Sequence, residues 1–147
     1  MTPPTTDRAM IIAERGAPWA PWAERFRALG PDVVVVLQHV GEPIADLAAR
    51  VRARLVELEA AGQAPQRAVL VGGGRVDRDA LSARSLTLRA VASSMARTGG
   101  GSVVLDDAGA DRYSMAALAA TVSMLVRGTG VTVDHAAMPG TPRPLAA

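Results

Sequence analysis

Val69-Leu-Val-Gly-Gly-Gly-Arg-Val-Asp77 is the stretch of sequence that decides the fold. An apolar run that ends at Val71 meets three glycines. Asp77 or Asp79 can then cap a helix that extends to about Arg97. A strand, a tight glycine turn and a helix form the basic unit of a parallel α/β sheet. Because open α/β sheets bind ligands at the carboxyl ends of their strands, the turn also marks the edge where a site is expected.

Four more strands and three more helices can be arranged around this unit. The predicted strands are 9–13, 33–37, 102–105 and 131–133, and the predicted helices are 17–29, 43–61 and 112–127. The alternation of strands and helices predicts a three-layer α/β/α sandwich with a mostly parallel five-stranded sheet, flavodoxin-like or Rossmann-like. Both of those strand orders place the first strand at the switch point, beside either the third or the fourth strand.

Two of the predicted strands differ in character. Residues 33–37 form a continuous run of Val and Leu, which is typical of a central parallel strand covered on both faces. Residues 9–13 form a short apolar run that could be an edge strand or part of a loop. We therefore expect 33–37 at the centre of the sheet.

Length and composition predict one globular domain over residues 1–135. The chain has 147 residues, of which 49% are hydrophobic and 20% charged. Residues 1–7 are expected to be a flexible lead, and the Ala- and Pro-rich residues 136–147 a disordered tail. Cysteine is absent, which excludes disulfides and cysteine nucleophiles. Because no signal peptide or membrane span is recognisable, we expect a cytoplasmic protein that does not contact a membrane.

All sixteen basic residues are arginine, and the formal net charge is only +2. The pI of about 10.3 is high because no lysine titrates near pH ~10.4, so that a small arginine excess carries it upward. The high pI is therefore weak evidence for nucleic-acid binding, which we consider unlikely. The absence of lysine also excludes Schiff-base chemistry.

Apolar stripes predict which helix faces are buried. The stripes are Trp19, Trp22, Phe26 and Leu29; Leu81, Ser85, Leu88, Ala92 and Met95; and Met115, Leu118, Val122 and Leu125. The aromatic stripe could form a ligand platform, but such stripes usually pack in the core. The helix Arg112 to Arg127 has no charged residue between its ends and is apolar nearly all round. This pattern predicts a homodimer contact through that helix.

Polar residues gather at the predicted carboxyl edge. The candidate ligand-binding residues are Gly72, Gly73, Gly74, Arg75, Glu14, Arg15, His39, Asp106 and His135. The glycine turn and Arg75 could hold a phosphate, or the glycines could simply form a tight turn. A dinucleotide fingerprint would need a glycine at position 77, which is Asp77.

Acid–base pairs could form between Asp134 and His135, or between His39 and Glu42. Asp106 and Asp107 could bind a hard cation, but we expect one of them to cap the loop and the other to be solvated. We predict no metal site and assign no cofactor. The leading hypothesis is a non-catalytic regulatory or protein-interaction domain that acts as a homodimer. The alternative is a protein or enzyme that binds a small anionic or nucleotide-like molecule at the carboxyl edge; whether the chain is an enzyme stays open.

Overall fold

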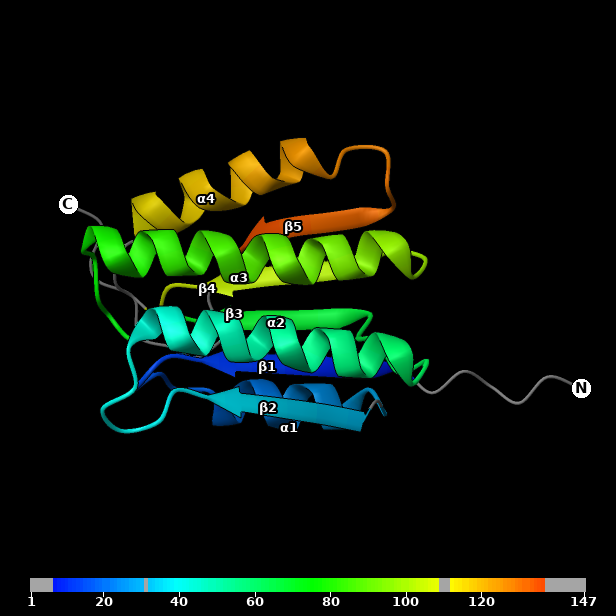
Figure 1. The fold of residues 1–147 in the computed structure, drawn as a ribbon, viewed down its shortest axis with the longest axis horizontal. Coiled ribbons are helices and arrows are strands. Elements are labelled where there is room, and N and C mark those ends of the chain that lie inside the picture. Colours follow the sequence, from blue (N-terminus) through cyan, green and yellow to red (C-terminus); the bar gives the residue numbers. More distant parts are fainter. Residues whose placement is uncertain (1–6, 31, 109–111, 137–147) are drawn as a thin grey trace, which may run out of the picture.

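The computed structural model describes residues 7–30, 32–108 and 112–136. Strands and helices alternate along them: β1 (Arg8–Ala13), α1 (Ala20–Ala28), β2 (Asp32–Leu37), α2 (Ile44–Ala60), β3 (Arg67–Val71), α3 (Arg78–Arg97), β4 (Gly101–Asp106), α4 (Arg112–Leu125) and β5 (Val131–His135). The strands form one parallel sheet in the order β2-β1-β3-β4-β5 (Figure 1). The predicted three-layer α/β fold is confirmed, and the first strand lies beside the third.

The helices divide unequally between the two faces of the sheet. On one face, α2, α3 and α4 cover a large core that includes Met10 and Ile12 of β1 (Figure 1). On the other face, Trp22 and Phe26 of α1 pack against Ile11 and its neighbours. The aromatic stripe is therefore mainly core, as expected, although Leu29 is exposed. Among the described residues, α1 is the only helix on this second face.

The expected central position of the second strand is wrong, whereas the first strand lies at the switch point, as expected, and is neither an edge strand nor part of a loop. β1 lies between β2 and β3 and is almost completely buried, whereas β2 forms an edge of the sheet. The valines of β2 do pack on both faces, with Val34 and Val36 on one core and Val33 on the other. A continuous apolar run thus indicates two covered faces, but it does not indicate whether the strand has a neighbour on each side.

The predicted apolar stripes of α3 and α4 are confirmed in part. Leu88, Ala92, Met95, Met115 and Val122 are buried as predicted, whereas Leu81, Ser85 and Leu118 are only partly buried. In α4 the buried positions are Met115, Ala119 and Val122, and Val126 just after the helix is also buried, whereas Leu125 is 61% exposed. In α3 the buried side includes Ala80, Arg84, Leu88, Val91 and Met95. Both helices contain many alanines, so the sequence leaves open how each is rotated, and packing against the sheet decides it. Asp77 is the N-cap of α3, since its carboxylate accepts from the Ala80 amide at 3.0 Å.

The predicted lead and tail lie outside the described residues, except for Asp7 and Ala136. Within the described part of the chain, no helix is both long enough and apolar enough to cross a membrane.

Candidate functional site

A crevice of about 430 Å³ lies at the carboxyl edge of the sheet, where β1, β2 and β3 end. Its walls are Glu14, Arg15, Gln38, Gly41, Glu42, Pro43, Gly73 and Arg75. From β1 the chain passes to β2, which pairs with one side of β1. The next strand, β3, pairs with the other side of β1, so the order of the strands reverses direction at β1. Open α/β sheets place their ligands at such a switch point.

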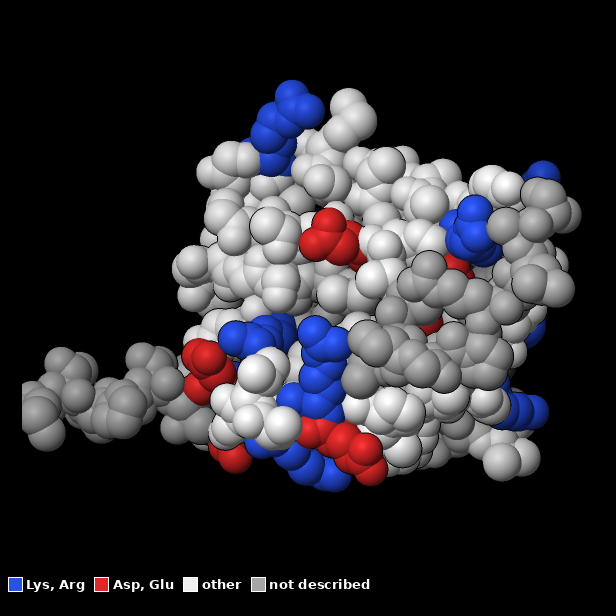
Figure 2. Space-filling model, turned by 180° about the vertical axis from the view of Figure 1, so that it is seen from behind, with Lys and Arg blue, Asp and Glu red and all other residues white. Residues whose placement is uncertain are grey.

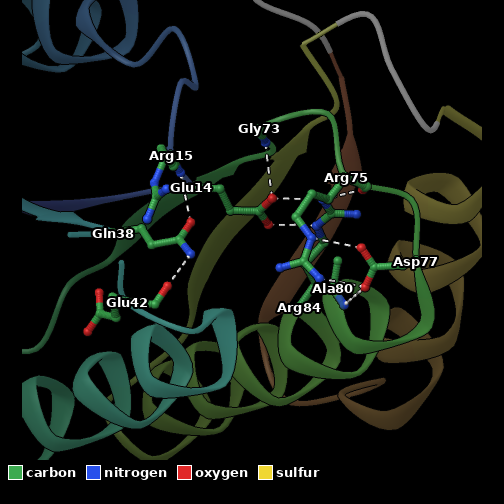
Figure 3. Close-up of polar contacts among 9 residues, drawn as sticks. All are labelled: Glu14, Arg15, Gln38, Glu42, Gly73, Arg75, Asp77, Ala80 and Arg84. Carbon is green, nitrogen blue, oxygen red and sulfur yellow. Dashed lines mark hydrogen bonds and ion pairs between the residues drawn. The ribbon is translucent and has the colours of Figure 1, made fainter. Parts of the chain in front are cut away.

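A buried ion pair lies beside the crevice, and its carboxylate, that of Glu14, lines the wall (Figure 3). The Arg84 guanidinium donates to both carboxylate oxygens of Glu14, at 2.6 and 2.7 Å, and both side chains are nearly inaccessible to solvent. The Gly73 amide donates to Glu14 at 3.0 Å, and Arg84 also donates to the Arg75 carbonyl at 2.6 Å. These contacts join the end of β1, the glycine turn and α3.

Gln38 joins the loops that follow β1 and β2 (Figure 3). Its amide oxygen accepts from the Arg15 backbone N–H at 2.8 Å, and its amide nitrogen donates to the Glu42 carbonyl at 2.8 Å. The Arg15 guanidinium donates to the His39 carbonyl at 3.2 Å. The two loops therefore have fixed positions relative to each other.

Glu42 is held by Arg50. The Arg50 guanidinium donates to both carboxylate oxygens, at 2.7 and 2.8 Å, and the His39 amide donates to the same carboxylate at 3.0 Å. The hydrogen bonds from Arg50 are the largest cause that lowers the pKa of Glu42 from 4.5 to about 2. Glu42 is therefore ionised at neutral pH, and both of its carboxylate oxygens already accept hydrogen bonds.

This low pKa predicts a loss of stability in acid. A carboxyl whose pKa is lower in the folded state stabilises the fold above its unfolded pKa, and that contribution is lost as the pH falls from about 4.5 to about 2. We expect Glu42→Gln to lower the free energy of unfolding by about 1 kcal/mol at pH 7, a value reduced for solvent screening. Near pH 2 the variant and the wild type should be equally stable. Urea denaturation at both pH values measures this, and an equal deficit at both would contradict it.

The glycine turn meets two structural requirements. A Cβ on Gly73 would lie 2.4 Å from the Arg15 carbonyl oxygen, so only glycine allows this approach of two backbones. Gly74 has φ +94°, a conformation that favours glycine. Gly72 contacts Met115, where an added Cβ would lie 3.3 Å from Cε. These contacts favour the tight-turn interpretation of the three glycines.

Arg75 is exposed and forms a bidentate pair with Asp77, at 2.7 and 2.8 Å. This contact is the main reason that the pKa of Asp77 falls from 3.8 to about 2. Arg75 also lines the crevice.

A second polar cluster lies at the ends of β4 and β5, outside the crevice walls. Asp106 is fully buried and accepts from the Trp22 indole N–H at 2.6 Å and from the Ala108 amide at 2.8 Å. Asp107 is also buried and contacts the His135 ring nitrogen at 2.6 Å. The expectation that one of the two aspartates would be solvated is wrong, because each meets a partner that is distant in sequence.

The predicted acid–base pairs do not form. His135 contacts Asp107 instead of Asp134, which is exposed, and the Glu42 carboxylate is occupied by Arg50 and the His39 amide. The structure therefore gathers four of the predicted site residues at the crevice, namely Glu14, Arg15, Gly73 and Arg75, while Asp106 and His135 belong to the second cluster. Within the described ranges, no three His, Asp or Glu side chains gather in a way that could hold a metal ion.

Sequence reasoning placed Gln38 at this edge but gave it no role, and it missed Arg84, Arg50 and the indole of Trp22 as polar parts of the edge. Arg84 could have been found from its position, since it lies four residues from both Ala80 and Leu88 on the buried side of α3. That signal can be used only once the rotation of the helix is known.

A different surface stands out on α4. Tyr113, Met124 and Leu125 are 82%, 69% and 61% exposed. The other exposed positions between Arg112 and Arg127 are uncharged, and they are Ala116, Ala117, Ala120, Thr121 and Ser123. We call these eight residues the outer face of α4. Seen from the α1 side, acidic and basic side chains gather in the lower part of the molecule, and charged side chains also stand out in the upper part, where β5 and the end of α4 lie (Figure 2).

No model of a known protein family matches the chain, and a search of curated proteins also gives no match.

Proposed function

We propose that the chain is a non-catalytic α/β domain that acts through protein–protein contact and forms a homodimer through the outer face of α4. The observation that carries the proposal is the exposure of this uncharged face on a chain in which one residue in five is charged. Single exposed apolar residues are common, but a continuous apolar helix face favours a contact surface.

The residue types on the outer face of α4 suit a self-contact. Interfaces are enriched in Tyr and Met and depleted in charge at their centres. Small residues such as Ala116 and Ala120 allow two helices to approach closely. A two-fold axis across α4 would pair the same surface from each copy and would close the assembly at two chains.

The carboxyl edge supports a non-catalytic role. Three of its carboxylates are held by partners that are not proton carriers at neutral pH: Glu14 by Arg84, Glu42 by Arg50, and Asp106 by the Trp22 indole. A general acid or base must be able to exchange a proton with a substrate. Carboxylates that are fixed in this way stabilise the loops and are not free to take up or release a proton in a reaction.

The test is the mass of the full chain in solution, measured by sedimentation velocity and light scattering. We expect a dimer for the wild type. Met124→Glu should weaken that dimer at least 100-fold, about 3 kcal/mol, because a charge would have to be desolvated in the contact. Leu86→Glu is the matched control, since Leu86 is 61% exposed, close to the 69% of Met124, but lies on α3. It should remain dimeric, and circular dichroism should show that both variants are folded.

Two results would overturn the proposal. One is a wild-type chain that stays monomeric at 100 μM or more, which is about the concentration at which a weak dimer would appear. The other is a Met124→Glu variant that dimerises as well as the wild type. Dissociation by Leu86→Glu alone would place the contact on the groove between α2 and α3, which Leu86 lines, and would also contradict a contact through α4.

A further inference from the structure

We propose that the crevice at the ends of β1, β2 and β3 binds a small organic anion, a phosphate or a carboxylate, through the guanidinium of Arg15. This proposal is independent of the dimer contact, because α4 contributes no residue to the walls of the crevice.

The first support is the distribution of charge around the crevice. Each of its two carboxylates has a guanidinium of its own, Arg84 for Glu14 and Arg50 for Glu42. Arg15 differs, because its guanidinium donates to a neutral carbonyl, that of His39, and forms no ion pair with a carboxylate in the described part of the chain. The crevice therefore contains one positive charge without a counterion.

The second guanidinium in the walls is that of Arg75. Asp77 already neutralises it, so it can add hydrogen-bond donors but no net charge. The Gly73 amide is also occupied, since it donates to Glu14. Because these groups of the glycine turn already have partners, we assign anion binding to Arg15 in the loop after β1. The sequence had suggested the glycine turn and Arg75.

The third support is that contacts between loops fix the walls of the crevice. Gln38 bonds the loop after β1 to the loop after β2, and the carbonyl of Arg15 lies close against the backbone of Gly73. A site whose walls are fixed beforehand loses little conformational entropy when a ligand binds. A guanidinium offers a planar set of donors that matches the oxygens of a carboxylate or a phosphate.

The size and chemistry of the crevice limit the ligand. A volume of about 430 Å³ lies in the range of small-molecule sites and is too small for a folded partner. Gly41 and Pro43 offer no charged group, so the body of the ligand is a small neutral group next to the anion. Because the carboxylates here are neutralised, the ligand is expected to be bound and not converted.

The experiment is a titration of the ¹⁵N-labelled full chain followed by NMR at constant ionic strength. The probes are glycerol 3-phosphate and glycerate, each with one anionic group on a neutral body, and glycerol is the neutral control. The amides of Gly41, Gly73 and Gly74 report on the crevice, and we expect them to shift in a saturable way with at least one of the two anions and not with glycerol. The anion that produces the shifts decides between a phosphate and a carboxylate ligand.

Arg15→Gln is the decisive variant, because it keeps the backbone contacts of position 15 and removes the guanidinium, with its charge and its hydrogen bond to the His39 carbonyl. It should weaken binding at least tenfold, whereas Arg25→Gln, which removes an exposed arginine of α1, should not change it. The proposal is overturned if the crevice amides do not move at 20 mM of either anion, or if Arg15→Gln binds as well as the wild type. Met124→Glu should bind normally, so a failure of the dimer proposal leaves this result intact.

Discussion

Arg84→Met is expected to lower the free energy of unfolding by about 3–5 kcal/mol, the usual cost of removing one partner of a buried ion pair. The variant leaves the Glu14 carboxylate, which is 4% exposed, without the guanidinium that contacts both of its oxygens. It also removes the donor to the Arg75 carbonyl, so the glycine turn loses a contact as well. Urea denaturation at pH 7 measures the effect.

Two controls separate the buried charge from a general effect of losing arginine. The double variant Arg84→Met with Glu14→Gln should recover a large part of the lost stability, because no uncompensated charge remains in the interior. Arg75→Met should leave the stability nearly unchanged, since its pair with Asp77 is exposed to solvent. The interpretation is wrong if Arg84→Met is no more destabilising than Arg75→Met.

Gly73→Ala is expected to cost about 3 kcal/mol, at the upper end of what overpacking usually costs. The new Cβ would lie 2.4 Å from the Arg15 carbonyl oxygen and 3.2 Å from the Cβ of Glu14, so the backbones of two loops would have to separate. The contact is between backbones, and no rotation of a side chain can relieve it. Thermal and urea denaturation both report this loss.

Gly62→Ala is the matched control for Gly73→Ala. Gly62 has φ +69° and no atom within 4 Å of an added Cβ, so it tests backbone conformation without a steric contact. It should cost about 1 kcal/mol, the lower end of the cost of a non-glycine residue in the left-handed region. If both variants lost the same free energy of unfolding, the contact with the Arg15 carbonyl would not be the reason that Gly73→Ala is destabilising.

The sequence predicts whether a segment is a strand or a helix better than it predicts which strands lie next to one another in the sheet. Every predicted strand and helix is present. Short apolar runs indicate strands and apolar stripes with helical spacing indicate helices, because both patterns depend on which faces of an element are buried. The order of the strands depends on pairings such as Ala13 with Val71, which join residues far apart in the chain and leave no local pattern. This is why β2, with its run of valines, could be mistaken for a central strand.

For the candidate site, the sequence predicts the edge of the sheet on which it lies but not the partners that hold its side chains. The edge of the sheet follows from the topology, so Glu14, Arg15 and Gly73 were expected near one another, and they line one crevice. The groups that hold them, such as Arg84 and Gln38, approach from other segments. Their roles depend on the rotation of a helix and on the path of a loop, which spacing along the sequence does not determine.

The position of β1 has a consequence for how the chain can fold while it is synthesised. β1 leaves the ribosome before the other four strands described here, yet in the finished sheet it lies between β2 and β3, and β3 begins only at Arg67. Glu14 meets Arg84 only after 70 further residues have been added. A nascent chain that ends before α3 can therefore pair β1 with β2, but it carries a carboxylate without its guanidinium. The N-terminal half reaches its final stability only when the middle of the chain has emerged.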